Sequence, residues 1–283
     1  MNVKAKVHET VNRIVSLVIA AALLAGCAGQ TPAARFDSAA RAAGFTIGEV
    51  AGAGFRHRTY AGTALDHRGD RLHIYLASDG TPFPRPAVIA ADPTPRQPLT
   101  LALMQRDPRS AVLLGRPCYH GLQDGCDARM WTIERYSQAV VDSMAAAIRR
   151  ILADGRYRDV VLIGYSGGGV LGLLLADRLT EVDAVVTLAA NLDTDAWTRR
   201  HGYTPLTGSL NPAAMTLTRD DLFHLHYSGA ADDNVPPAIH RAMAEKLPAG
   251  SLRTLAGFDH YCCWVDRWPD LLDDVEQYLS RRR

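Results

Sequence analysis

The fold of this chain is decided by the stretch Asp159-Val-Val-Leu-Ile-Gly164-Tyr-Ser166-Gly-Gly168-Gly169-Val. The apolar run 160–163 predicts a short buried strand, and the Leu- and Ala-rich run 170–179 predicts a helix. The turn between them has the spacing Gly-x-Ser-x-Gly. A sharp turn that exposes a serine hydroxyl leaves no room for side chains two residues before and after it. The stretch therefore predicts Ser166 as a nucleophile. A chance turn is the weaker interpretation, although the chain has 23 glycines.

Strand and helix patterns alternate from residue 71 to the end of the chain. This alternation predicts one α/β domain, with a mostly parallel twisted sheet and helices on both faces. Two earlier strands, 45–50 and 55–60, are expected to be antiparallel. The other expected strands are 71–77, 111–114, 160–163, 184–189, 222–227 and 252–255, and the expected helices are 99–105, 131–153, 170–179, 212–217, 237–247 and 268–279.

Length and composition fit one globular domain with a full core. The chain has 283 residues, of which 47% are hydrophobic and 22% charged, with a net charge of +1. A charge so close to zero offers no electrostatic reason to expect a nucleic-acid partner. The oligomeric state is not predicted.

The first residues differ in kind from the rest. Lys4, Lys6 and Arg13 precede an apolar run, 14–25, that is too short to span a bilayer and is typical of a secretory signal. The run ends in Leu24-Ala25-Gly26-Cys27, which resembles the lipobox of bacterial lipoproteins. The resemblance implies that residues 1–26 are a signal peptide and that Cys27 is lipidated. An ordinary signal peptide with a coincidental cysteine is the alternative.

Lipidation would fix the location of the protein. Several acyl chains on Cys27 anchor a protein stably, since each buried methylene contributes about 0.8 kcal/mol. Ala28 follows the cysteine, and in lipoproteins of Gram-negative bacteria this pattern suggests the outer membrane. We therefore expect an exported protein, lipid-anchored and facing the periplasm, with residues 27–44 as a tether and 45–283 as the folded domain.

Four cysteines remain after the signal peptide, and an even number in an exported protein predicts disulfides. Our first choice of pairing is Cys118 with Cys126, which leaves Cys262 and Cys263 as a vicinal bridge or as free thiols. We expect no metal, because no Cys-x-x-Cys or clustered Cys/His spacing is present. The hypothesis that follows is that disulfides rigidify the walls of the site.

A serine nucleophile needs a base, and the base needs an orienting acid. Loops at the carboxyl ends of parallel strands meet at one edge of the sheet, so the candidates follow later strands. Asp232 follows the strand ending at residue 227, and His260 follows the last strand. Asp233 is an alternative acid. His120 is the rival base, whereas His224 and His226 lie within a strand and are expected to be structural.

The sequence resembles the α/β-hydrolase superfamily over roughly residues 45–283. The resemblance rests on the Ser166 turn, on Gly229-x-x-Asp232-x-x-Val235-Pro236 and on Gly257-Phe-Asp-His260, which occur in the order nucleophile, acid, base. It implies the α/β-hydrolase fold and the hydrolysis of an ester or related acyl bond in a small-molecule substrate, without a cofactor. Asp259 is expected to face away from the site or to cap the turn.

Such an enzyme holds the developing oxyanion with two backbone amides. The first is expected from Gly167, directly after the nucleophile. The resemblance implies the second from Gly80 or Thr81, in the loop after the strand 71–77, where many hydrolases have His-Gly. Here Asp79 precedes Gly80. A carboxylate beside an oxyanion would oppose it unless Asp79 turns away to bond the proline-rich loop that follows.

The segment 190–221 predicts a small cap rather than a long apolar lid. Four aromatic residues are candidates for the pocket wall: Trp131, Trp197, Tyr261 and Trp264. The alternative is burial in the core, which is the commoner place for isolated aromatic residues. Two other functions stay open. The same three residues also suit a peptidase or acyltransferase, and the fold also occurs in proteins that only bind, which would make this chain a non-catalytic surface lipoprotein.

Overall fold

A computed structural model of the chain describes residues 30–62, 71–121, 125–153 and 155–281. Residues 32–283 form one compact unit. The predicted signal peptide and Cys27 lie outside the described residues. Within the described part, no helix has the length and apolar character that crossing a membrane requires.

The centre of this unit is an eight-stranded sheet with the order β1-β2-β4-β3-β5-β6-β7-β8. β2 pairs antiparallel with both β1 and β4, and every other pair is parallel. The mostly parallel sheet predicted from the sequence is therefore confirmed. The strands are β1 (Thr46–Ala51), β2 (Arg56–Ala61), β3 (Arg71–Leu76), β4 (Ser110–Leu114), β5 (Asp159–Tyr165), β6 (Ala184–Leu188), β7 (Phe223–Gly229) and β8 (Leu252–Leu255).

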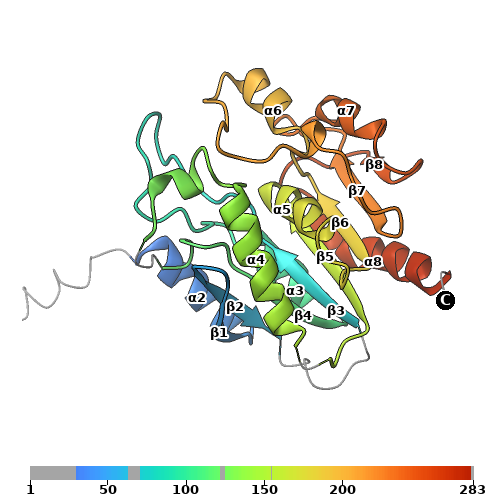
Figure 1. Cartoon of the computed structure of the whole chain (residues 1–283), viewed down its shortest axis with the longest axis horizontal. Helices are drawn as coiled ribbons and strands as arrows, with labels where there is room; N and C mark the ends of the chain where they lie inside the picture. Colours follow the sequence, from blue (N-terminus) through green and yellow to red (C-terminus); the bar gives the residue numbers. More distant parts are fainter. Residues whose placement is uncertain (1–29, 63–70, 122–124, 154, 282–283) are drawn as a thin grey trace, which may run out of the picture. The chain divides into compact units, whose positions relative to one another are not determined.

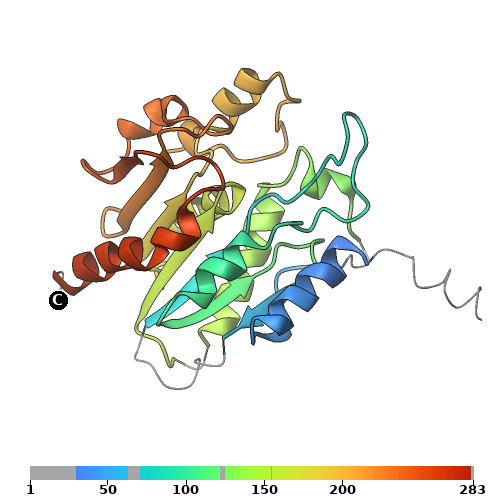
Figure 2. The same cartoon turned by 180° about the vertical axis from the view of Figure 1, so that it is seen from behind.

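Helices cover both faces of the sheet, because alternate side chains of the buried strands point to opposite faces. From β5, Val160 and Leu162 join the core under α4 and α5, whereas Val161 and Ile163 join the core under α2, α3 and α8. The first face is seen in Figure 1 and the second in Figure 2. The helices are α2 (Pro32–Ala42), α3 (Leu99–Gln105), α4 (Gln138–Ile151), α5 (Gly167–Ala176), α6 (Thr194–His201), α7 (Arg241–Ala244) and α8 (Trp264–Arg281), with 3₁₀ turns η2 (Ala128–Trp131), η3 (Pro212–Ala214) and η4 (Pro237–His240).

Part of the expected tether is folded. Helix α2 occupies most of the segment 27–44, and it buries Phe36 and Ala40 against the sheet. Those two side chains are four residues apart, so they lie on one face of the helix. The small polar composition of the segment concealed this apolar pair, and the prediction of a tether over residues 32–42 was wrong.

Helix α4 begins later than expected, and α6 was not expected. The hydroxyl of Ser137 accepts the amide of Val140, and this cap starts α4 seven residues later than the expected start at Trp131. The segment 190–221 contains α6, which the apolar pattern did not predict; Asp193 caps its beginning and Gly202, with φ of 63°, ends it.

Candidate active site

Ser166 occupies the sharp turn between β5 and α5, as predicted. Its φ of 54° and ψ of −125° are a conformation that side-chain-bearing residues rarely adopt. A Cβ on Gly164 would collide with the carbonyl of Gly168, and one on Gly168 would collide with the carbonyl of Leu76. Both glycines are therefore required by close backbone contacts, and the turn holds the serine at the carboxyl edge of the sheet.

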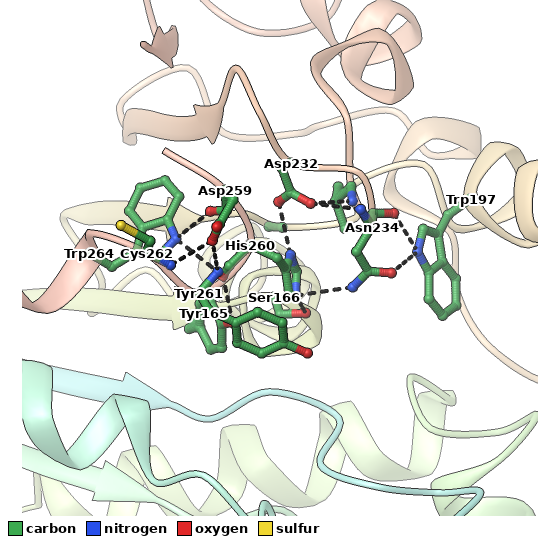
Figure 3. A network of polar contacts seen from close by, with 12 residues as sticks. Tyr165, Ser166, Trp197, Asp232, Asn234, Asp259, His260, Tyr261, Cys262 and Trp264 are labelled. Carbon is green, nitrogen blue, oxygen red and sulfur yellow. Dashed lines mark hydrogen bonds and ion pairs between the residues drawn. The ribbon is translucent and has the colours of Figure 1, made fainter. Parts of the chain in front are cut away.

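The structure brings Ser166, His260 and Asp232 together (Figure 3). The Nε2 atom of His260 lies 3.2 Å from the Ser166 Oγ, and its Nδ1 lies 2.8 Å from Oδ2 of Asp232. Asp232 is 1% exposed, whereas Asp233, the alternative acid, is exposed to solvent. Because Nδ1 donates to a carboxylate, the lone pair of Nε2 faces the serine hydroxyl.

Asp232 is itself held by the turn that follows β7. Its Oδ1 accepts the backbone amides of Asn234, at 2.9 Å, and Val235, at 2.7 Å. These charge-assisted bonds leave Oδ2 directed at the imidazole. The carboxylate of Asp232 is therefore oriented by its own loop.

Asn234 is a member of the site that sequence reasoning missed. Its Nδ2 lies 3.1 Å from Nε2 of His260, so the amide and the Ser166 hydroxyl share one acceptor. The backbone oxygen of Asn234 accepts from Trp197 at 3.1 Å (Figure 3). It also accepts from His201 at 2.8 Å, and both contacts connect the site to α6. The signal available in the sequence was its place two residues after the acid.

The backbone around His260 is fixed from two sides. Its carbonyl accepts from the Tyr165 hydroxyl at 2.7 Å and from Nε1 of Trp264 at 3.2 Å. Asp259 accepts the amides of Tyr261 and Cys262, so it caps this turn, as expected. Trp264 is fully buried and bonds the His260 carbonyl rather than lining a pocket.

Asp79 forms a buried charge cluster beside the nucleophile turn. Its oxygens lie 2.8 Å from a nitrogen of Arg116 and 2.9 Å from one of Arg135, and the Tyr136 hydroxyl donates to it at 2.6 Å. Burial alone would raise the pKa of Asp79, but the two guanidinium groups outweigh this and lower it. Among the described residues, the carboxylate of Asp79 therefore contacts Arg116, Arg135 and Tyr136 and not the proline-rich loop, and the two arginines neutralise it.

The backbone amides expected to bind an oxyanion differ in whether they already have a hydrogen-bond partner. Gly167 begins α5, where the amides of the first turn have no partner within the helix. The amide of Gly80 donates to the Ser78 hydroxyl at 3.3 Å, and that of Thr81 donates to the Pro93 carbonyl at 2.9 Å. The second donor therefore stays a prediction.

A cavity of about 1200 Å³ opens over Ser166 and His260. Trp197 and Tyr261 line it, as the sequence suggested, but Trp131 is buried and its Nε1 bonds the carbonyl of Ala90 instead. The remaining wall is largely apolar and comes from the beginning of α3 and from the loops after β3, before α4 and after α6. Its members include Phe83, Ile89, Leu99, Ile133 and Leu206.

The rival histidines lie away from this cavity, as far as the described residues show. His120 is 3% exposed, and its Nδ1 bonds the Tyr60 hydroxyl at 2.9 Å. Burial lowers the pKa of His120 to about 3. His226 bonds Thr187 within the sheet, and His224 lies beside it, so both are structural, as expected.

Two disulfides are present in the part of the chain that the structure describes. Cys118 is joined to Cys126, which was our first choice, and Cys262 is joined to Cys263. Cys118 follows Arg116 of the charge cluster by two residues, and Cys262 follows His260 by two residues. Both bridges are therefore close in sequence to residues that build the site.

The sequence matches no family model, and no curated protein is significantly similar to it. Solved structures are similar in fold. A lidless α/β serine hydrolase from Xanthomonas campestris has 14% identity and a TM-score of 0.55, covering 83% of this chain and 94% of that one. An esterase from Pyrococcus furiosus has 11% identity and a TM-score of 0.56, covering 84% and 90%. A membrane phospholipase A, described as a bacterial virulence factor, has 15% identity and a TM-score of 0.57, covering 95% and 98%. The chain has the α/β-hydrolase fold.

Proposed function

We propose that the chain is a serine hydrolase, similar to carboxylesterases, that cleaves an ester or related acyl bond of a small-molecule substrate. The observation that carries this proposal is the alignment of Ser166, His260 and buried Asp232, with 3.2 Å and 2.8 Å between the bonded atoms. Structural ion pairs rarely include a strained serine at the floor of a large cavity, so catalysis explains the arrangement best.

The chemistry follows from the direction of these bonds. As Oγ of Ser166 attacks the acyl carbon, Nε2 of His260 takes its proton, and Asp232 stabilises the imidazolium that forms. Collapse of the tetrahedral intermediate expels the alcohol, to which His260 returns the proton. A water molecule then attacks the acyl-enzyme by the same route, and the cycle requires no cofactor.

The developing oxyanion is assigned to the beginning of α5. The amide of Gly167 is one donor, and the aligned peptide dipoles of the helix favour negative charge there. Gly80 remains the candidate for the second donor, if its weak bond to Ser78 exchanges for one to the substrate. Asp79 does not oppose this charge, because Arg116 and Arg135 flank it.

The same proposal includes the location. The sequence Leu24-Ala25-Gly26-Cys27 supports lipidation of Cys27 and anchoring to a bacterial membrane, in the outer membrane facing the periplasm. Growth with a radioactive fatty acid tests this directly. Label on the parent chain and none on Cys27→Ser is expected, and label on neither would leave an ordinary signal peptide.

Turnover of p-nitrophenyl esters tests the activity. We expect Ser166→Ala to lower kcat at least about 10⁴-fold and Asp232→Asn by about the same factor. The matched control is Asp233→Asn, which changes the exposed neighbour and should leave turnover unchanged. Equal losses in the two aspartate variants would contradict the assignment. Faster cleavage of aminoacyl amides than of esters would favour a peptidase, and inactivity of the folded parent would favour a binding lipoprotein.

A further inference from the structure

Exposed apolar side chains gather at the mouth of the cavity. Among the described residues, the large apolar side chains that stay exposed are Phe83, Val88, Ile89, Tyr203, Tyr261 and Tyr278. Four of these line the cavity, and Val88 is adjacent to Ile89, so only Tyr278, on α8, lies elsewhere. We call Phe83, Val88, Ile89, Tyr203 and Tyr261 the apolar rim. Such a concentration marks an interaction surface.

The part of the rim that follows β3 is held in place by the chain itself. The amide of Ala90 donates to the Pro82 carbonyl at 2.8 Å, and that of Thr81 donates to Pro93 at 2.9 Å. A bridge between Arg85 and Val88 closes the tip of this loop. The loop therefore presents its apolar side chains to solvent in an ordered, hairpin-like form, and they are exposed although the chain around them is bonded.

The charged side chains that line the cavity are mostly cationic. Arg85 and Arg96 line the cavity and are exposed. The carboxylate among the lining residues belongs to Asp79, which Arg116 and Arg135 neutralise. Apolar side chains combined with arginines suit an anionic phospholipid surface, since the rings and aliphatic groups enter the acyl boundary while the cations meet the headgroups.

The beginning of the folded unit lies beside the same loop. The amide of Ala33, in the first turn of α2, donates to Asp92 at 2.8 Å, and Asp92 belongs to the loop that carries Phe83 and Ile89. Both views show the beginning of α2 and this loop on the same side of the sheet (Figures 1 and 2). Four residues separate Cys27 from Pro32, so a lipidated Cys27 would hold this side within about 18 Å of its membrane.

We propose that the apolar rim, with Arg85 and Arg96, docks on an anionic phospholipid bilayer, so that the acyl substrate enters the cavity from the lipid. This inference rests on the hydrolase activity and the lipid anchor proposed above. It also explains how a cavity that the described residues cover with α6 and with the loops after β3 and before α4 receives an apolar substrate without a long apolar lid. Docking of the exposed rim, rather than the opening of a lid, would give the substrate access to the cavity.

A fluorescence measurement on the full chain tests the docking without reference to catalysis. Val88→Trp places an indole in the apolar rim, at a position outside the cavity lining. Tyr278→Trp places one on α8, at an exposed position away from the rim. Both carry Ser166→Ala and are reconstituted into vesicles of phosphatidylglycerol and phosphatidylcholine with brominated acyl chains. Compared with unbrominated vesicles, the emission added by Val88→Trp should be quenched and that added by Tyr278→Trp should not.

Other occupants of the rim give different results. If residues 14–25 or a second copy of the chain cover it, the Val88→Trp emission is already blue-shifted without vesicles and bromination does not quench it. Equal quenching of both indoles would show that the protein lies on the membrane by another face. Either outcome overturns the proposal. Pure phosphatidylcholine vesicles should quench less, because the arginines lose their anionic partners.

A second variant links docking to turnover. Val88→Asp places a negative charge at the rim, and one charge near an anionic surface changes association by about fivefold. We expect hydrolysis of an ester embedded in phosphatidylglycerol vesicles to fall by about that factor, while a soluble p-nitrophenyl ester is cleaved as before. Tyr278→Asp is the control and should change neither rate. If the parent and Val88→Asp cleave the embedded ester at equal rates, the docking proposal is contradicted. If the parent cleaves neither ester, the proposed hydrolase function is refuted, while the quenching experiment still tests docking by itself.

Discussion

The carboxylate of Asp79 lies against the Cα of Gly167, the residue that follows the nucleophile. A Cβ added to Gly167 would overlap Oδ1 of Asp79. The charge cluster around Asp79 therefore packs directly on the turn that positions Ser166. Its two arginines are almost fully buried, with Arg116 4% exposed and Arg135 6% exposed.

Asp79→Asn removes the carboxylate that these two guanidinium groups share. Breaking a buried ion pair on one side leaves charge without compensation, which costs about 3–5 kcal/mol. We expect the free energy of unfolding in urea to fall by about that amount. Asp233→Asn removes an exposed carboxylate and serves as the control. A loss of unfolding free energy below about 1 kcal/mol would mean that solvent, rather than Asp79, compensates the positive charges of Arg116 and Arg135.

Asn234→Ala tests the shared acceptor on His260. With Nδ2 removed, the Ser166 hydroxyl has Nε2 to itself, and the backbone contacts of residue 234 to Trp197 and His201 remain. A neutral hydrogen bond is worth about 1 kcal/mol. We therefore expect kcat/KM for a small soluble ester to rise about fivefold. A fall of more than tenfold would show that the amide assists the reaction instead of competing with the serine.

Glu276 joins α8 to the sheet through Arg71, whose guanidinium donates to it at 2.7 Å. Burial would raise the pKa of Glu276, but hydrogen bonds from His73 and Arg71 and the charges of Arg71 and Arg109 lower it to about 2. A carboxyl whose folded pKa lies below its ordinary value stabilises the fold above that ordinary value, near 4.5. This stabilisation is lost as the pH falls from there toward 2.

Glu276→Gln should accordingly lower the free energy of unfolding at pH 7 by about 2 kcal/mol, with solvent screening allowed for. The difference from the parent should shrink as the pH falls below about 4.5. Asp273→Asn, an exposed carboxyl on the same helix, should change stability by less than about 0.5 kcal/mol. Urea unfolding at several pH values measures the stability of the parent, Glu276→Gln and Asp273→Asn. A stability difference between the parent and Glu276→Gln that does not change with pH would refute the role of the Glu276 charge.

The Cys118–Cys126 bridge closes a short loop next to the charge cluster. Replacing both residues by serine should lower stability by about 2.5 kcal/mol, the loop entropy that the bridge removes from the unfolded chain. If the bridge rigidifies the wall of the site, ester turnover should fall while the far-ultraviolet circular dichroism stays unchanged. Mild reduction of the parent should have the same effect. Full activity after reduction would restrict the bridge to a role in stability.

The elements nearest the site were the most predictable from the sequence. The Ser166 turn was visible because its glycines are required locally, and Asp232 and His260 followed from the edge where parallel strands end. Asp79 was predicted with the wrong partners, since Arg116 and Arg135 reach it from separate segments and nothing local signals their approach. Asn234 was missed for the same reason, because its contact with His260 depends on where the fold places the imidazole.

Segments whose state depends on packing were predicted less well. Helix α2 has a polar, small-residue sequence and is helical because Phe36 and Ala40 find a place on the sheet. Trp131 and Trp264 were candidates for the pocket wall, with burial in the core as the alternative, and both lie in the core. Aromatic side chains bury so much apolar area that packing in the core, rather than contact with a substrate, usually determines where they lie.

The central claim is that Ser166 is an activated nucleophile. Reaction with a fluorophosphonate, followed by intact-mass and peptide mass spectrometry, measures this directly. One adduct is predicted, on the peptide that contains Ser166; it should be absent from Ser166→Ala, much slower to form in Asp232→Asn and unchanged in Asp233→Asn. An adduct on another residue, or none on the folded parent chain, would contradict the account.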